Sequence, residues 1–183
     1  AWYLTKSQVL RSSDYGIPQI RDRIYFVWIR KDLAVEEYKF PEKKPNMATV
    51  GEYLINDDES FLFTENSKWW KTFMWYMNNN YNRWKFSVDD LLKDEGVILD
   101  TRQSDLRIYK WVCPTLRTWR HWIMYIKRWQ LRKLSWFEAL LLQWFPKKKA
   151  MRAEIINDRK LLAQAWNAFT VSVIRQVAEN IPF

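Results

Sequence analysis

The chain has 183 residues, a length that fits one domain or slightly more, and its hydrophobic content of 48% is that of a globular protein. One cysteine and one histidine exclude a disulfide framework, a cysteine-rich zinc site and most histidine-based catalytic centres. The formal net charge is +9, and neither an apolar run near 18 residues nor a signal-peptide pattern occurs, so we expect a cytoplasmic protein without a metal site.

The N-terminal part predicts two strands separated by a turn. Residues 3–10 alternate weakly between polar and apolar side chains, which is typical of a strand. Residues 12–18 are rich in turn formers. Residues 24–29 are apolar on both faces, the pattern of a strand buried in a parallel sheet. Residues 34–48 combine charges with Pro41 and Pro45 and predict a linker, with a domain boundary near residue 46.

The middle of the chain predicts a β-rich module with a basic segment. Between about 49 and 131 the pattern is irregular, with short β-like runs at 107–109 and 123–126. Residues 101–133 hold nine Lys or Arg against one acid, Asp105, so this segment carries +8 and the rest of the chain only +1. Such a density is typical of a polyanion-binding surface, and a solvated basic face is the alternative.

The C-terminal part predicts two helices. Ser135 followed by Glu138 is a capping-box pattern, so a helix is expected over about 136–144, ending before Pro146. A second helix is expected over about 167–180. Its apolar side, at helical spacing, would consist of Ala168, Val171, Ile174, Ala178 and Ile181.

Three ordered blocks carry a family resemblance. They are PQIRDRIY at 18–25, RKLSWFEALLLQWFP at 132–146 and QAWNA at 164–168. In order and spacing they resemble the last three conserved blocks of the DNA cytosine-5 methyltransferases, P-Q-x-R-x-R, R-x-L-T-x-x-E-x-x-R-L-Q-G-F-P and Q-x-G-N-A. A variable stretch separates the first two blocks, where this family keeps its target-recognition domain. The resemblance covers essentially the whole chain.

The resemblance implies an α/β fold, the C-terminal part of a Rossmann-like methyltransferase sheet joined to a β-rich, mixed α+β target-recognition domain. We assign residues 1–45 to the end of the catalytic domain and 46–146 to the target-recognition domain with the second block. Residues 147–183 are expected to return to the catalytic domain as a C-terminal helix. S-adenosylmethionine is the implied cofactor and double-stranded DNA the implied partner.

The motifs that perform the family's chemistry do not occur in this chain. In the family a cytosine is flipped out of the duplex, a cysteine of a P-C-Q motif attacks C6, and a glutamate of an E-N-V motif handles the proton at N3. Cys113 lies in V-C-P-T-L and is not that nucleophile. We therefore expect an inactive C-terminal half, whose catalytic half lies upstream or on another chain and without which it folds poorly.

The resemblance also assigns site residues. Gln19, Arg21 and Arg23 fall in the pocket for the flipped cytosine, where two guanidiniums on one face of a strand would engage O2 and a nearby phosphate. Surface arginines screened by an acid are the alternative. Asn167 and Ala168 fall at the methionine end of the cofactor, with a helix N-cap asparagine as the alternative.

DNA contacts are expected from the region before the second block. Thr115-Leu116 resembles the family's Thr-Leu pair, whose threonine touches the backbone near the target. Phosphate contacts, which position a protein without reading sequence, are expected from Arg117, Arg120, Lys127 and Arg128. In the second block, Arg132, Glu138 and Gln143 match positions that organise the recognition domain against the catalytic one. Leu141 departs from the family's arginine there.

Thirteen Trp against three Gly is an inverted composition. Trp144 and Trp166 stand where the second and third blocks have Gly, and Trp69-Trp70, Trp119 and Trp122 lie in turn-like polar settings. Our hypothesis is that the gene uses UGA as a glycine codon that was translated as Trp. The alternative is a genuinely Trp-rich chain, with indoles in the core or stacked on bases. A literal Trp166 would place an indole beside the expected cofactor pocket.

Two further interpretations of the chain remain open at this stage. It could be a separately encoded specificity subunit that pairs with a catalytic chain. It could also be a degenerate, non-catalytic DNA binder, which genuine Trp at positions 144 and 166 would favour.

Overall fold

The computed structural model describes residues 2–33, 36–44, 48–102, 105–117 and 123–182. The strands are β1 (Tyr3–Arg11), β2 (Gln19–Ile20), β3 (Asp22–Arg30), β4 (Ile98–Arg102), β5 (Asp105–Tyr109), β6 (Cys113–Pro114), β7 (Ile123–Lys127) and β8 (Gln130–Lys133). The α-helices are α1 (Lys68–Asn78), α2 (Val88–Lys93), α3 (Trp136–Leu141), α4 (Lys147–Met151), α5 (Asp158–Asn167) and α6 (Val171–Glu179). Short 3-10 turns occupy Ser12–Asp14, Lys31–Leu33, Val50–Tyr53, Glu59–Phe61 and Arg152–Ile155.

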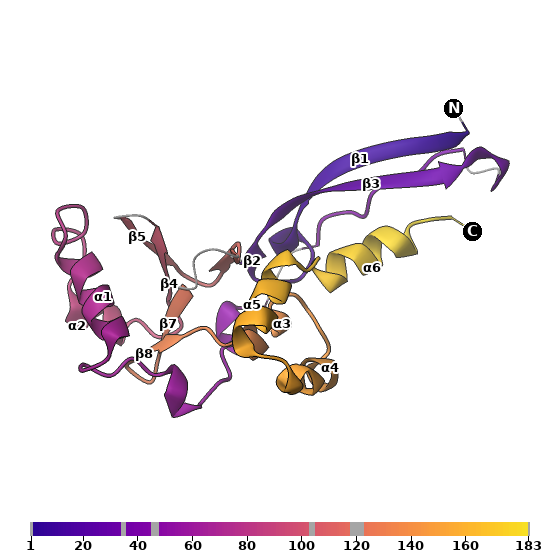
Figure 1. The fold of residues 1–183 in the computed structure, drawn as a ribbon. Helices are drawn as coiled ribbons and strands as arrows, with labels where there is room; N and C mark the ends of the chain where they lie inside the picture. The colour runs from indigo at the N-terminus through magenta and orange to yellow at the C-terminus, as the bar shows by residue number, and fades with distance from the viewer. Residues whose placement is uncertain (1, 34–35, 45–47, 103–104, 118–122, 183) are drawn as a thin grey trace.

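The first two predicted strands form a long antiparallel hairpin that extends away from the rest of the chain (Figure 1). Successive side chains of β3 face opposite sides. The inner-face side chains are buried: Tyr25, Val27 and Ile29. The outer-face side chains are about half exposed: Ile24, Phe26 and Trp28. The prediction of a strand buried in a parallel sheet is therefore wrong, because β3 pairs antiparallel with β1 and α6 covers only the inner face.

The centre of the chain is a four-stranded antiparallel sheet in the order β5-β4-β7-β8. Both of its faces are packed. Ile123 and Tyr125 of β7 join a core with α3 and α5, whereas Met124 and Ile126 join a second core with Phe73 of α1. The predicted runs at 107–109 and 123–126 are confirmed as strands, but α1 and α2 lie in a region whose pattern predicted no helix.

The capping box at the second block is confirmed. Ser135 Oγ accepts the Glu138 N–H at 3.2 Å, and Glu138 Oε2 accepts the Ser135 N–H at 2.9 Å. The helix that follows is α3, which ends at Leu141 and so, as predicted, before Pro146.

The second predicted C-terminal helix is confirmed as α6, and α5, which precedes it, was not predicted. α5 ends at Asn167 and α6 begins at Val171, so Asn167 is not an N-cap. The buried side of α6 carries Val173 and Val177, while Ile174 of the predicted apolar side is 40% exposed. The predicted apolar side is wrong, because α6 packs on the hairpin through the face that carries Val173 and Val177.

Three tryptophans occupy backbone positions that favour glycine. Among the described residues, four non-glycines have φ in the left-handed region, and three of them are Trp111 (71°), Trp129 (63°) and Trp144 (61°). Trp144 follows α3 in a Schellman motif, in which the Phe145 N–H donates to the Leu140 carbonyl at 3.1 Å and the Trp144 N–H donates to the Leu141 carbonyl at 2.8 Å. Glycine is the usual residue at that position of the motif.

Trp129 lies in the two-residue loop that joins β7 to β8, with Lys127 paired to Gln130. Arg128 and Trp129 both have positive φ, as a type I′ turn requires, and its second position favours glycine. These backbones support the glycine hypothesis at three sites.

Other tryptophans differ. The prediction of a turn at Trp69-Trp70 is wrong because both residues lie in α1. Trp119 and Trp122 are outside the described residues.

Candidate functional site: a junction of three blocks at strand β2

Strand β2 brings together segments that are far apart in the sequence. Gln19 pairs in parallel with Cys113 and Ile20 with Pro114, and the Thr115 hydroxyl donates to the Ile20 carbonyl at 2.5 Å. Arg21, directly after β2, reaches the turn after α5. The first block, the Thr-Leu pair and the third block therefore meet at one junction.

Arg21 is the buried cation of this junction. It is 2% exposed, and its Nη2 donates to the Trp166 carbonyl at 2.9 Å and to the Ala168 carbonyl at 2.7 Å. Its Nε and Nη1 are buried without a hydrogen-bond partner among the described residues. Burial, with a smaller contribution from the Arg23 charge, lowers the pKa of Arg21 to about 10, so it remains a cation at neutral pH. Arg21 thus holds the C-terminal end of α5 against strand β2.

Gln19 is also buried, within a polar network. Its Oε1 accepts from Gln143 Nε2 at 3.1 Å, and the Thr170 hydroxyl donates to Gln143 Oε1 at 3.1 Å. The hydroxyls of Thr170 and Ser12 lie 2.8 Å apart. These four side chains come from four separate segments and are at most 2% exposed.

Arg23 differs from Gln19 and Arg21 because its side chain is only partly buried. Its Nη1 donates to the Asp22 carbonyl at 2.7 Å. Of the three predicted pocket residues, Arg23 is therefore the one with access to solvent and to a ligand in this chain.

The residues predicted for the cofactor lie at the end of α5. Asn167 is exposed and offers a donor and an acceptor, which suits the polar methionine end of S-adenosylmethionine. The Trp166 indole is 5% exposed and packs beside Leu134 and Leu162 in the core.

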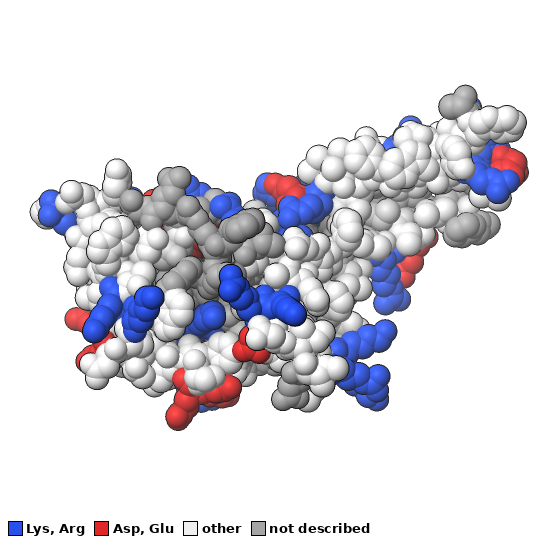
Figure 2. All heavy atoms as spheres, in the orientation of Figure 1, with Lys and Arg blue, Asp and Glu red and all other residues white. Residues whose placement is uncertain are grey.

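The basic segment is partly neutralised by acids. Lys127 pairs with Asp57 at 2.9 Å and Lys110 pairs with Asp94 at 2.5 Å, both acids lying outside the segment. Arg132 is buried. On the face shown in Figure 2, Lys and Arg side chains form separate groups, with acidic side chains at its lower edge. The high density of cations in the sequence therefore does not become one continuous basic surface on that face.

The predicted DNA contacts fall into different settings. Arg117 and Arg128 are exposed, although Arg128 Nη1 lies 3.5 Å from Asp57. The Lys127 side chain is 20% exposed and held in its ion pair. Thr115 is partly buried against Ile20, and Arg120 lies outside the described residues.

Cys113 is fully buried in the core beside the junction. Burial raises the pKa of its thiol, and the charges of Asp100 and Glu138 act in the same direction. A protonated, inaccessible thiol is a poor nucleophile, which agrees with the interpretation of Cys113 as structural.

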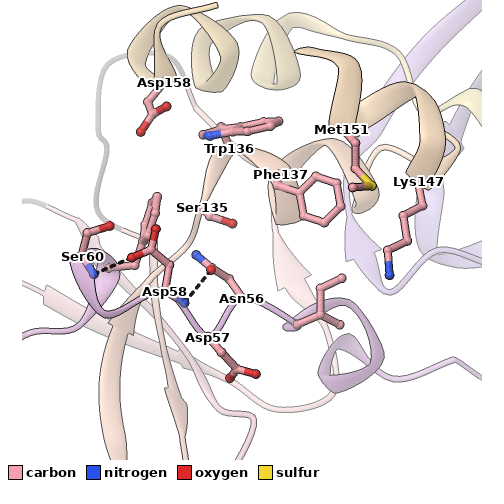
Figure 3. A pocket seen from close by; sticks show the side chains of 12 residues that line it. Asn56, Asp57, Asp58, Ser60, Ser135, Trp136, Phe137, Lys147, Met151 and Asp158 are labelled. Carbon is pink, nitrogen blue, oxygen red and sulfur yellow. Dashed lines mark hydrogen bonds between the residues drawn. The ribbon is translucent and has the colours of Figure 1, made fainter. Parts of the chain in front are cut away.

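A cavity of about 520 Å³ lies between the 55–61 segment and helices α3 and α4 (Figure 3). Three carboxylates line it, from Asp57, Asp58 and Asp158, together with Lys147 and the Trp136 ring. None of the predicted site residues lines it. Because carboxylates repel phosphates, this cavity does not suit a DNA backbone.

The described residues include neither a cluster of metal ligands nor a helix that could span a membrane. No group of three or more His, Cys, Asp or Glu side chains is arranged to hold a metal ion. No described helix has the length and apolar character needed to cross a bilayer.

The family model of the C-5 cytosine-specific DNA methylases matches residues 2–182. The chain belongs to this family. It is 30% identical to the Type II methyltransferase M.Bsp6I of Bacillus sp. (strain RFL6), over 98% of this chain and 55% of that protein. It is 27% identical to the Type II methyltransferase M.NlaX of Neisseria lactamica, over 99% of this chain and 53% of that protein.

Solved structures confirm the predicted fold class. A DNMT2 mutant of Spodoptera frugiperda superimposes with a TM-score of 0.63 at 14% identity, over 97% of this chain and 57% of that one. The Entamoeba histolytica methyltransferase EhMeth gives 0.56 at 18% identity, over 98% and 53%. The chain thus spans about half the length of the relatives it matches. It carries a mixed α/β part of the fold of these methyltransferases.

Proposed function

We propose that this chain is the C-terminal part of a DNA cytosine-5 methyltransferase, which flips a cytosine out of the duplex and transfers a methyl group from S-adenosylmethionine to its C5. The observation that carries this proposal is the junction at β2, where Gln19, Thr115 and the 166–168 turn are held together by hydrogen bonds or strand pairing with their neighbours. A base pocket, a recognition segment and a cofactor turn must be adjacent, because base and methyl donor react at close range.

The roles divide by exposure. Arg23 is accessible, and its rigid donor fork suits the cytosine O2 or the neighbouring phosphate. Gln19 and Arg21 shape the pocket from within. Asn167 and Ala168 contact the methionine end of S-adenosylmethionine, which supplies the methyl group when bound.

The catalytic cysteine belongs to an N-terminal half, encoded in the same gene or on a separate chain. Two observations support this: Cys113 is buried, and the chain spans about half the length of its relatives. The outer face of β3, with Ile24, Phe26 and Trp28 half exposed, offers that half an apolar surface to cover. This chain alone is accordingly inactive.

Double-stranded DNA binds beside the junction. Thr115 bonds the pocket strand directly, so a contact made by its segment acts close to the target base. Arg117 and Arg128 are exposed and suited to phosphates, whereas Lys127 contributes less because it is paired with Asp57. Arg120 remains a predicted phosphate contact from sequence.

A separately encoded DNA-specificity subunit is the second candidate. The observation that favours it is a hydrophobic core formed entirely by residues 63–131, which gives the recognition region its own packing. Such a subunit would bind DNA without help, whereas a fragment of one enzyme would need its N-terminal half.

The test is a fusion of the N-terminal half of M.Bsp6I to this chain, assayed for transfer of radiolabelled methyl groups to DNA. We expect transfer by the fusion and none by the chain alone. Arg23→Ala should lower the transfer rate about 100-fold, because a positioned charge on the reacting base is lost. Arg30→Ala, an exposed arginine on the same strand, is the matched control and should leave the rate unchanged.

Methyl transfer by the chain alone would contradict the division into two halves. Equal transfer rates for Arg23→Ala and Arg30→Ala would show that Arg23 does not act in the cytosine pocket. Tight, sequence-selective DNA binding by the chain alone, with no transfer by the fusion, would favour the specificity subunit.

A further inference from the structure

We propose that Gln143 is a positioning residue, which fixes the Gln19 amide in the cytosine pocket through a directed chain of hydrogen bonds. The proposal deepens the function proposed above and rests on it. The second block would then act on the pocket itself, besides organising the recognition domain against the catalytic one.

The direction of donation along this series of hydrogen bonds follows from counting the hydrogens of each group. A threonine hydroxyl has one hydrogen, and that of Thr170 is donated to Gln143 Oε1 at 3.1 Å. In the 2.8 Å contact between the two hydroxyls, Thr170 has no hydrogen left to donate, so Ser12 is the donor; its hydrogen is shared with the Arg21 carbonyl, which lies 3.3 Å from Ser12 Oγ. Gln143 Nε2 in turn donates to Gln19 Oε1 at 3.1 Å. The chain runs from Ser12 through Thr170 and Gln143 to Gln19, with one orientation for each amide.

The hydrogen-bonded network is rigid because its four side chains are buried. Ser12, Thr170, Gln143 and Gln19 are at most 2% exposed, so rotation of an amide would leave buried groups unpaired. The Gln143 carbonyl also accepts the Val171 N–H at 2.9 Å, which ties the second block to the start of α6. Gln143 thereby connects the pocket strand, the second block and the C-terminal helix.

The fixed orientation leaves Gln19 with a defined free group. Its Nε2 is buried and has no hydrogen-bond partner among the described residues. Because Gln19 Oε1 accepts from Gln143, the other end of the amide, Nε2, is an unpaired hydrogen-bond donor. A group with acceptor oxygens, brought by the bound base or by the N-terminal half, is the chemistry that it fits.

The experiment uses the fusion described above and compares Gln143→Met, Thr170→Val and Thr170→Ser. We expect the single-turnover rate of methyl transfer to fall about tenfold in Gln143→Met and about threefold in Thr170→Val. The KM values for DNA and cofactor should stay within about twofold, because binding surfaces are untouched. Thr170→Ser retains the hydroxyl and should restore the rate. Gln8→Met, at an exposed position of β1 outside the three blocks, is the matched control and should leave the rate unchanged.

A second measurement does not depend on activity. In NMR spectra of the fusion, the side-chain amide protons of Gln143, which donates to Gln19, should exchange slowly with solvent, and Thr170→Val should accelerate that exchange whereas Thr170→Ser should not. A wild-type rate in Gln143→Met, or Gln143 exchange unaffected by Thr170→Val, would overturn the proposal. If Gln143→Met does not fold, the two Thr170 variants decide. A wild-type fusion that transfers no methyl group but shows the expected exchange would contradict the proposed function alone.

Discussion

The central sheet and the N-terminal hairpin differ in how their apolar side chains are covered. Both faces of the sheet are packed, one against α1 and α2 and the other against α3 and α5. The hairpin is covered on its inner face by α6 and Tyr38, while its outer face stays about half exposed. Figure 1 shows the same contrast, since the hairpin extends beyond the packed centre.

The difference separates two sources of stability. The core between the sheet and α1 uses residues 63–131 only, so contacts close in sequence stabilise it. The hairpin core joins β3 to Val173 and Val177, far along the chain, and lacks cover on one side. The sheet region should therefore resist unfolding by itself, whereas the hairpin should depend on a further layer of protein.

Substitutions of two phenylalanines test this difference between the sheet and the hairpin. Phe73 is 1% exposed in the sheet core, and Phe26 is 49% exposed on the hairpin. We expect Phe73→Ala to lower the free energy of unfolding by about 3–5 kcal/mol, because it empties a packed core. Phe26→Ser should change it by less than about 0.5 kcal/mol in the isolated chain, measured by urea denaturation. Similar losses for both would show that the outer face is already covered, for example by self-association.

The three tryptophans with positive φ give a prediction of intermediate effect on the free energy of unfolding. Glycine at positions 111, 129 and 144 should raise the free energy of unfolding by about 1 kcal/mol each, because a positive φ strains residues with a Cβ. Trp75, 58% exposed on helix α1, is the matched control. Glycine there should lower stability by about 1 kcal/mol, because it weakens a helix. Thermal melts of the four variants measure both signs.

Opposite signs at these positions would support glycine as the natural residue of the three turns. The codons provide an independent check, since the hypothesis requires UGA at all thirteen tryptophans. UGG codons would establish genuine tryptophan and would favour the non-catalytic DNA binder.

Local chemistry made part of this structure predictable. The capping box of Ser135 and Glu138 and the runs at 107–109 and 123–126 depend on neighbouring residues, and each is confirmed. The three blocks predicted the family, which the match over 2–182 confirms. The positions of the cytosine-pocket, cofactor and DNA contacts, and the domain boundary near residue 46, stay predictions.

The rest depends on contacts between distant segments. Periodicity placed Ile174 on the buried side of the last helix, but the hairpin packs against the neighbouring face, which carries Val173 and Val177. Charge density predicted an open basic surface, but Asp57 and Asp94 come from outside the segment to pair with its lysines. A pattern along the sequence does not contain such partners, so the burial of Arg21 and the network at Gln143 emerge only from the fold.

The smallest expected effect is at the base of the hairpin, where Arg11 and Asp22 pair across β1 and β3 at 2.7 and 3.0 Å. The hydrogen bond from Arg11 holds the pKa of the Asp22 carboxyl below its ordinary 3.8. Since the folded pKa lies below the unfolded one, the pair stabilises the protein above the unfolded value, and this contribution is lost as the pH falls through the folded pKa.

Asp22→Asn should therefore lower the melting temperature slightly at about pH 7, and this loss should shrink as the pH falls through the folded pKa and the carboxyl takes up a proton. The effect is small because both side chains are about half exposed and salt screens them. Differential scanning calorimetry at low and high salt measures it. A loss that persists at high salt would mean that the hairpin depends on this pair more than on its inner-face packing, and the contrast with the central sheet would then lie in electrostatics as well as in apolar cover.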